Sequence, residues 1–394
     1  MPPSFSYRSK ILAVANWLLA LVVALAAVHC TSAQAIDYVD CKQEGKTTHL
    51  SGKTIVQAQD GGVLLLAPDG HLWTLQPEQI LAKRHDDQTF SPLAGDELRK
   101  SVLADLPAGF DATSTTHYLI CYNTSRGYAQ WCGALFERLY LAFTNFWKNR
   151  GFKLHDPAMP LVVVIYADQK TYINHSSDEL GNNGSRIIGF YSLQTNRVKM
   201  FDLTGAEKAR PGGEKRADAA SINQVLSRPE AAMMVTTVIH EATHQIAFNC
   251  GLQQRFADIP LWLCEGLAEY FETPDLSFGK GWRTIGEINR PRLAQFQEYL
   301  MHRPADSLTT LLANDKRFRN PSQALDAYAE AWALNYFLLR QRPKEFQNYI
   351  DRLSKKGPLE LDEPAERLQE FKASFGSDLA ALDNEFLRYM ARVK

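Results

Sequence analysis

Residues 240–244 of this 394-residue chain read His-Glu-Ala-Thr-His, a spacing that can bind a metal ion. Side chains four residues apart share one face of a helix, so His240 and His244 can both reach one ion. Glu241 can then face a water molecule at the metal and take its proton. Strongly apolar flanks indicate a buried helix, and buried paired histidines need a partner. The sequence therefore predicts a catalytic zinc site.

A catalytic zinc takes three protein ligands and leaves one position open. The extended motif with a third histidine would place it where the chain has Cys250, so that class is excluded. A second predicted helix carries Glu265, Glu269 and Glu272 on one face. One of these carboxylates can bind the metal, and another can hold a ligating histidine through its other ring nitrogen. Asp258 is an alternative third ligand, although its place before a proline suits a helix N-cap better.

The second helix is predicted over residues 260–272, and it contains the run Trp262-Leu263-Cys264-Glu265-Gly266-Leu267-Ala268. Together the two segments resemble the gluzincin metallopeptidases, the clan of thermolysin and the aminopeptidase-N-like enzymes. The resemblance implies that His240, His244 and Glu265 bind one zinc ion per chain, and that Glu241 is the general base. As a whole, the chain is most similar to a group of secreted bacterial gluzincin-like proteins.

The resemblance implies further roles on the same and later helices. Glu269 resembles the acid that holds a ligating histidine in thermolysin-type enzymes, and Glu272 is the rival for that role. In aminopeptidase-N-like enzymes, a tyrosine on a later helix donates to the oxyanion that forms during hydrolysis. Tyr328 stands at a matching distance from the ligand glutamate, and Tyr336 is the alternative.

The chain departs from the aminopeptidases of this clan in one respect. Their Gly-x-Met-Glu-Asn motif, which grips the substrate amine, does not occur in this sequence. The prediction is therefore a zinc endopeptidase or another amide hydrolase, with a peptide or protein as substrate. The alternative is a catalytically inactive, zincin-like binding or scaffold protein of the cell envelope. The intact Glu241 favours the enzyme, because a purely structural metal site needs no base there.

The first 35 residues have the pattern of a secretory signal peptide. Arg8 and Lys10 precede an uncharged run over residues 11–28, and Ala33 and Ala35 form a small-residue cleavage site. Cleavage after Ala35 would give a secreted or periplasmic protein without a membrane span. An uncleaved anchor is the alternative, because the run reaches the lower limit of a spanning helix.

Cysteine usage is compatible with an oxidising compartment. Five cysteines follow the predicted cleavage site, and two local pairs are plausible, Cys121 with Cys132 and Cys250 with Cys264. Cys41 would then stay free. Alternatively, all five are buried thiols.

The hydrophobic pattern predicts an α+β fold, in which a zincin-like catalytic domain follows a small β-module. Asp69-Gly70 between two apolar runs is a strong hairpin signal. Farther on, the pattern predicts strands at 118–122, 161–166 and 196–203 and a helix at 127–149. The predicted parts are a signal peptide (1–35), a β-barrel-like module (36–86), a linker (87–110, within a polar stretch that starts near 84), a metallopeptidase domain (111–345) and a helical extension (346–394).

Three finer expectations concern the catalytic domain. The strands at 189–191 and 196–201 could form the edge that holds an extended peptide. Residues 204–221 are rich in glycine, alanine and basic residues and are predicted to be a loop. Ser227 and Glu230 have the spacing of a capping box for a helix from about Ala231 to Phe248.

Charge excludes one class of partner. The chain has 43 basic and 44 acidic residues, which leaves a formal net charge of -1. A nucleic-acid-binding protein usually has a basic excess or stripe, and this sequence has neither. The partner of the β-module is not defined by the sequence.

Overall fold

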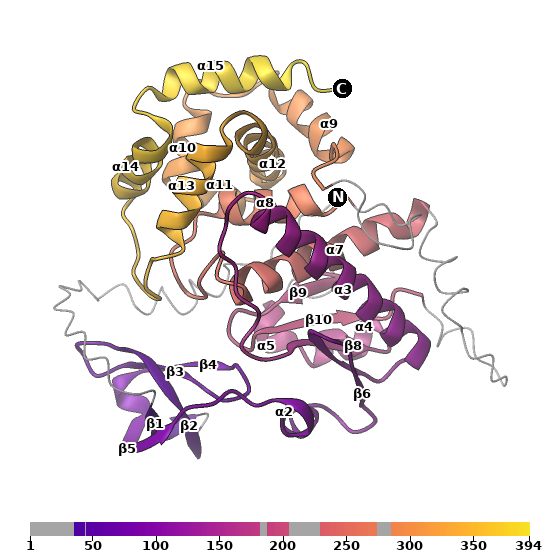
Figure 1. The fold of residues 1–394 in the computed structure, drawn as a ribbon, viewed down its shortest axis with the longest axis vertical. Helices are drawn as coiled ribbons and strands as arrows, with labels where there is room; N and C mark the ends of the chain where they lie inside the picture. Colours follow the sequence, from indigo (N-terminus) through magenta and orange to yellow (C-terminus); the bar gives the residue numbers. More distant parts are fainter. Residues whose placement is uncertain (1–34, 44, 182–186, 205–228, 274–284) are drawn as a thin grey trace.

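The computed structural model describes residues 35–43, 45–181, 187–204, 229–273 and 285–394 (Figure 1). The fold is mixed α+β, as predicted, with an N-terminal β-module followed by a mixed sheet and a helical C-terminal part. Residues 1–34 of the predicted signal peptide, the loop over 205–221 and the capping residue Ser227 lie outside the described residues. No described helix is long and apolar enough to cross a membrane.

The β-module is one antiparallel sheet with the strand order β4-β3-β2-β1-β5. The hairpin predicted at Asp69-Gly70 is present and joins β3 to β4, and a second turn joins β2 to β3. The module's own core is small and consists of Val39, Cys41, Val63, Leu65 and Leu75. Its elements are β1 (Ala35–Gln43), β2 (Lys46–Gln57), β3 (Val63–Leu66), β4 (Leu72–Leu75), the 3-10 turn η1 (Pro77–Gln79) and β5 (Ile80–Thr89).

The polar stretch predicted as a linker is largely ordered secondary structure. Residues up to Thr89 belong to β5, which pairs with β1, and α2 (Gly95–Ala104) follows. β5 is exposed along most of its length, because it is an edge strand. Its residues therefore lack the apolar alternation that marks a half-buried strand.

The second sheet has the strand order β6-β7-β8-β10-β9. Its three inner strands run parallel, and the two edge strands pair antiparallel to them. The continuous apolar runs of β7 and β8 follow from burial on both faces, whereas β10 contains Arg197 and Lys199. The strands are β6 (Asp111–Ser114), β7 (Tyr118–Tyr122), β8 (Leu161–Tyr166), β9 (Gly189–Tyr191) and β10 (Arg197–Phe201).

Helices cover both faces of this sheet. The long helix α3 (Arg126–Lys148) and helix α7 (Pro229–Asn249) share one apolar core with alternate residues of β7 and β8. Helix α2 and α4 (Gln169–Asn174) pack on the opposite face, and α5 (Ser177–Leu180) follows α4.

Both proposed cysteine pairs are wrong, since all five described cysteines are buried free thiols. Cys121 points to the α2 face of the sheet, whereas Cys132 on α3 lies in the core on the other face. Cys264 contacts His244 and a glutamine instead of Cys250.

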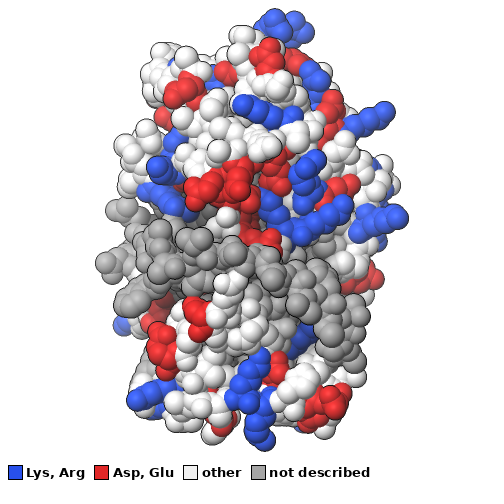
Figure 2. All heavy atoms as spheres, turned by 90° about the vertical axis from the view of Figure 1, so that its left-hand side faces the viewer, with Lys and Arg blue, Asp and Glu red and all other residues white. Residues whose placement is uncertain are grey.

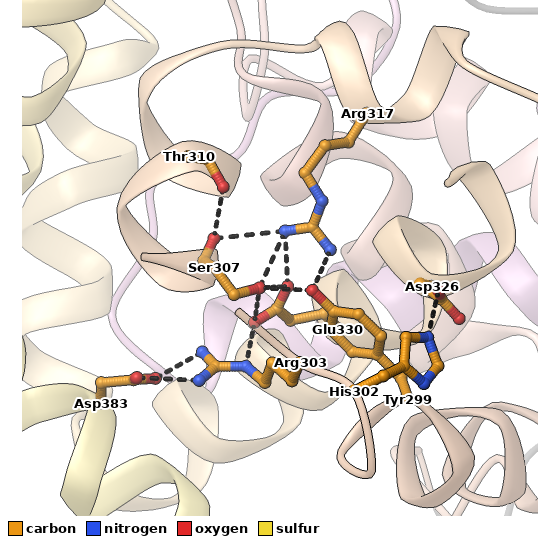
Figure 3. A network of polar contacts seen from close by, with 9 residues as sticks. All are labelled: Tyr299, His302, Arg303, Ser307, Thr310, Arg317, Asp326, Glu330 and Asp383. Carbon is orange, nitrogen blue, oxygen red and sulfur yellow. Dashed lines mark hydrogen bonds and ion pairs between the residues drawn. The ribbon is translucent and has the colours of Figure 1, made fainter. Parts of the chain in front are cut away.

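The C-terminal part is a helical assembly around α12 (Figure 1). Figure 3 shows that Glu330 of α12 accepts hydrogen bonds from Arg303, Ser307 and Arg317. These contacts join α12 to its neighbours. The helices are α8 (Leu261–Phe271), α9 (Arg290–Tyr299), α10 (Ser307–Ala313), α11 (Lys316–Arg319), α12 (Ala324–Gln341), α13 (Pro343–Leu353), α14 (Pro364–Phe375) and α15 (Leu379–Met390).

Surface charge agrees with the balanced composition. In Figure 2, groups of basic and acidic side chains are interspersed over the described residues of the face in view, so neither sign covers it.

Candidate metal centre

Helix α7 carries the histidine motif on a face that is enclosed by the protein. Ile239, Ala242 and Ile246 pack into the main core. Gln245 on the same helix donates to the carbonyl oxygens of Val162 and Asn196, each at 2.9 Å. The helix is therefore attached to the sheet by packing and by hydrogen bonds, and this fixes the direction in which its histidines point.

The predicted ligands lie together. His240 Nε2 is 3.1 Å from His244 Nε2 and 3.1 Å from Glu265 Oε2, and His244 Nε2 is 3.8 Å from the same oxygen. The three side chains are at most 3% exposed. Among the described residues, this is the one group of three such side chains whose donor atoms could hold a metal ion.

The spacing of the three donor atoms fits a zinc ion. Tetrahedral ligands at zinc distances of about 2.0–2.1 Å lie about 3.3 Å from each other. The observed separations of 3.1, 3.1 and 3.8 Å bracket that value. Two imidazoles and a carboxylate are also ligands that zinc accepts.

The charges around the donors favour a cation between them. Burial disfavours charged imidazoles, but Glu265 and Glu272 raise the pKa of His240. Burial would raise the pKa of Glu265, yet the two histidines hold it at about 2. A site that stabilises positive charge on buried histidines would equally stabilise a divalent ion.

Glu272 holds the first histidine. The Nδ1–H of His240 donates to Glu272 Oε2 at 2.8 Å, which leaves Nε2 directed at the other donors. Asn289 Nδ2 in turn donates to Glu272 Oε1 at 2.8 Å, and Asn289 also caps α9 by accepting from Arg292 N. The sequence analysis missed Asn289, although its place before Arg290-Pro291 is a helix-start signal.

Glu269, the first candidate for that role, points elsewhere. It is fully buried and pairs with Arg292, whose Nε lies 2.7 Å from Glu269 Oε1. One turn of helix therefore separates a carboxylate that supports the metal ligands from one that supports α9. Arg292 was not anticipated, and nothing in the local sequence marks it.

The second histidine has an unusual neighbour. His244 Nδ1 lies 3.5 Å from Cys264 Sγ, and Cys264 is 3.3 Å from Gln253 Oε1. Cys264 directly precedes the predicted ligand Glu265. Its thiol therefore lies on the far side of the imidazole from the donor cluster.

Glu241 contacts the edge of the sheet. Its Oε2 accepts the backbone N–H of Tyr191, the last residue of β9, at 2.8 Å. Glu241 is 2% exposed, and this burial raises its pKa. Of the two segments expected to form the edge, β9 is the edge strand, whereas residues 197–201 form β10, an inner strand that pairs with β8 and β9. Glu241 contacts β9 through Tyr191 N.

The surroundings of Tyr328 and Tyr336 differ. Burial raises the pKa of Tyr328, Glu265 and Glu269 add to this effect, and the Arg292 guanidinium stands 5.4 Å from its ring. The ring of Tyr336 instead packs against Tyr270 and Tyr389, and the Arg340 guanidinium stands 4.4 Å from its centre.

Asp258 is neither a ligand nor a cap. Its carboxylate binds Arg367, with Oδ2 3.0 Å from the arginine Nε. The first N–H of α8, at Leu261, donates to Asp315 at 3.0 Å. The predicted cap is therefore wrong, because a distant aspartate provides it.

The glycine that follows Glu265 in the predicted motif, Gly266, is required by the close packing of α8 against α12. A Cβ atom at this position would lie 2.2 Å from Asn335 Nδ2 and 2.5 Å from Ala331 O, both on α12. Asn335 Nδ2 also donates to Trp262 O at 2.8 Å. The glycine lets α8 approach α12 closely, and so it fixes Glu265 beside the histidines.

Residues 234–360 match a family described as a protein of unknown function (DUF1570). The match includes the three predicted ligands and Tyr328. A search of curated proteins found no match to the chain.

Proposed function

We propose that this protein is a secreted, zinc-dependent metallopeptidase of the gluzincin type. The observation that carries the proposal is the cluster of His240, His244 and Glu265, with donor separations that suit zinc and Glu241 beside it. The Trp-Leu-x-Glu-Gly-x-Ala run around Glu265 supports the same class. The predicted signal peptide supports a secreted or periplasmic location.

Zinc bound by these residues would polarise the scissile carbonyl and make a water molecule acidic. Glu241 would accept the proton of that water and pass it to the leaving amine. Tyr328 would donate to the oxyanion from the α12 side. Strand β9 would hold an extended peptide, and the missing amine-binding motif favours an endopeptidase.

The competing candidate is a zincin-like binding or scaffold protein. Burial favours it, because the three ligands and Glu241 are each at most 3% exposed. A structural site is normally closed by four protein ligands, whereas this cluster offers three. The carboxylate of Glu241 beside the donors is an arrangement that hydrolysis needs and a structural site does not. We therefore place the peptidase first.

The decisive experiment measures zinc per chain in the purified protein and in two variants. Glu265→Ala should lose most of the metal, because it removes a ligand. Glu241→Gln should keep the metal and lose hydrolysis of an unfolded protein substrate by at least about 100-fold. Full activity of Glu241→Gln would contradict the mechanism. A native protein that binds no zinc would contradict the whole site.

A further inference from the structure

The turn between β3 and β4 of the N-terminal module reaches the strand that contacts Glu241. This turn contains Asp69, Gly70 and His71, and it lies against residues 192–196, which connect β9 to β10. We propose that the β-module is a positioning element for Glu241, acting through this connection. The proposal rests on the proposed function only for the role of Glu241 as a base.

The first step is the contact between the strand and the base. Ser192 N donates to Arg197 O, and amides alternate in direction along a strand, so the Tyr191 N–H points away from β10. That free N–H donates to Glu241 at 2.8 Å. The position of Glu241 therefore depends on the position of β9.

The second step is the attachment of the β9–β10 turn to α7. Asn196 has a positive φ of 60°, and its side chain accepts from Tyr191 OH at 2.7 Å and from Asn249 Nδ2 at 2.7 Å. Gln245 donates to the Asn196 carbonyl. The turn and the helix that bears Glu241 thus form one hydrogen-bonded unit.

The third step is the contact of the module with the same turn. Leu72 N donates to Gln194 O at 2.7 Å. Arg255 Nη1 donates to both Gly70 O at 2.9 Å and Leu193 O at 3.0 Å, so one guanidinium joins the two turns.

An ion pair is the last of these contacts, and it joins the β-module to the start of β10. Arg197 at the start of β10 lies 3.0 Å from Asp69 and 2.7 Å from Asp105, which follows α2. Arg197 is 4% exposed, and its Nε has no hydrogen-bond partner. A buried guanidinium needs its carboxylates, so loss of Asp69 should loosen this end of the strand.

The module also shares the main core of the protein. Leu64 and Leu72 belong to the large cluster with α3 and α7, whereas the adjacent Val63 and Leu65 face the module's own core. A module that served as a separately tethered docking domain would not need to bury residues in the core that holds the site. These contacts favour a fixed support.

Gly70 and Gly61 provide a matched pair of variants. Both have positive φ angles, 87° and 98°, so alanine introduces similar backbone strain at each. At Gly70 the new Cβ would lie 2.8 Å from Met159 Sδ and 3.5 Å from Asn196 Nδ2, whereas at Gly61 its nearest neighbour is Pro77 within the module, at 3.8 Å. Both substitutions strain a turn, but only the turn that contains Gly70 contacts Arg255 and the segment between β9 and β10.

The test uses the full chain, with hydrogen exchange measured by mass spectrometry over residues 187–200 and zinc measured per chain. Gly70→Ala should raise exchange in this segment by on the order of tenfold, with zinc content unchanged, and Gly61→Ala should match the native protein. Asp69→Asn is the second variant if Gly70→Ala does not fold, and it should give a smaller increase. Unchanged exchange in the tested variant would overturn the proposal, as would an equal increase in Gly61→Ala.

A second readout separates this proposal from the proposed function. With a peptide substrate, Gly70→Ala should lower kcat by on the order of tenfold and leave KM nearly unchanged, because a displaced base acts on the chemical step. If kcat stays native while exchange rises, the module does not position Glu241 and the proposal fails. If the native protein hydrolyses no peptide, the proposed function fails, while the exchange comparison still tests the structural connection.

Discussion

Helix α8, which carries Glu265, and strand β9, which contacts Glu241, are held in place by different kinds of interaction. Helix α8 lies against α12 with every residue buried, and Gly266 allows the two backbones to approach. β9 is buried and paired with β10, and polar contacts attach it and the turn that follows it to other elements. Tyr191 N donates to Glu241, Gln245 donates to Asn196 O, and Arg255 donates to Leu193 O. Arg197 at the start of β10 pairs with Asp69 of the β-module.

This difference separates metal binding, which depends on α8, from the positioning of Glu241, which depends on β9. Around Gly266, the described contacts of α8 with α12, which hold the ligand side, include no charge that titrates. The base side has ion pairs and charged hydrogen bonds in addition to its packing, so it depends on charge. Changes in the helical part should therefore affect metal binding and stability together, whereas changes at the module should affect the base and leave the metal in place.

The largest effect is expected where the tight packing is broken. Gly266→Ala would drive a Cβ into Asn335 and the Ala331 carbonyl. The carbonyl cannot move without shifting α12, and Asn335 would lose its hydrogen bond to Trp262 O. We expect a loss of about 3 kcal/mol of unfolding free energy, together with reduced zinc content. Urea unfolding followed by circular dichroism measures the first effect, and metal analysis measures the second.

Gly133→Ala on α3 is the matched control. Its Cβ would meet only the side chains of Thr115 at 3.0 Å and Ile120 at 3.7 Å, and alanine favours the helix. This variant should stay within about 1 kcal/mol of the native protein. Equal stability of the two variants would contradict the importance of the α8–α12 contact.

The next largest effect is a pH dependence of the contact between the β-module and the β9–β10 turn. Burial lowers the pKa of His71 to about 4, with Arg197 acting in the same direction and Asp69, Glu179 and Asp105 opposing it. The unfolded chain therefore binds more protons than the folded one between about pH 4 and 6.5. Stability of the module contact is complete above pH 6.5 and falls as the pH decreases toward 4. Between pH 7 and pH 5 the loss should be about 1.8 kcal/mol, or about 20-fold in local opening.

Hydrogen exchange of residues 63–75 at the two pH values, corrected for intrinsic rates, measures this loss. His71→Phe removes the titrating group and keeps a ring beside Trp73, which the His71 ring stacks on at 3.9 Å. The variant should lose the pH dependence, while exchange in α12 should be the same in both proteins. If hydrogen exchange of residues 63–75 in the native protein does not depend on pH, protonation of His71 does not weaken this region and the prediction is wrong.

The two regions also differ in how well the sequence predicted them. The ligand spacing of His240 and His244 is local to one helix, and Glu265 follows from a short motif, so the structure places these residues as expected. Helices and buried strands were found because their apolar periods are regular. The end of β5, from about residue 84 to 89, was taken for linker because its exposed residues have no such period.

The missed residues act over long sequence distances. The contacts of Tyr191 with Glu241 and of Asn289 with Glu272 depend on how separate elements pack, and no spacing rule reports them. The cysteine pairs failed for a similar reason. The alternation of β7 places Cys121 on the face opposite to α3, but only the fold shows which helix covers which face.

The smallest expected effect distinguishes the two neighbouring carboxylates of α8. Glu272→Gln keeps an oxygen that can accept from His240 Nδ1 but removes the charge that favours the metal-bound imidazole. We expect zinc affinity to fall by about tenfold, measured by competition with a chelator. Glu269→Gln is the matched control, because it makes the same change one turn away, where the partner is Arg292. It should leave zinc affinity unchanged. If Glu269→Gln weakens zinc as much as Glu272→Gln does, the metal responds to the total charge of the helix, and the hydrogen bond to His240 has no special role.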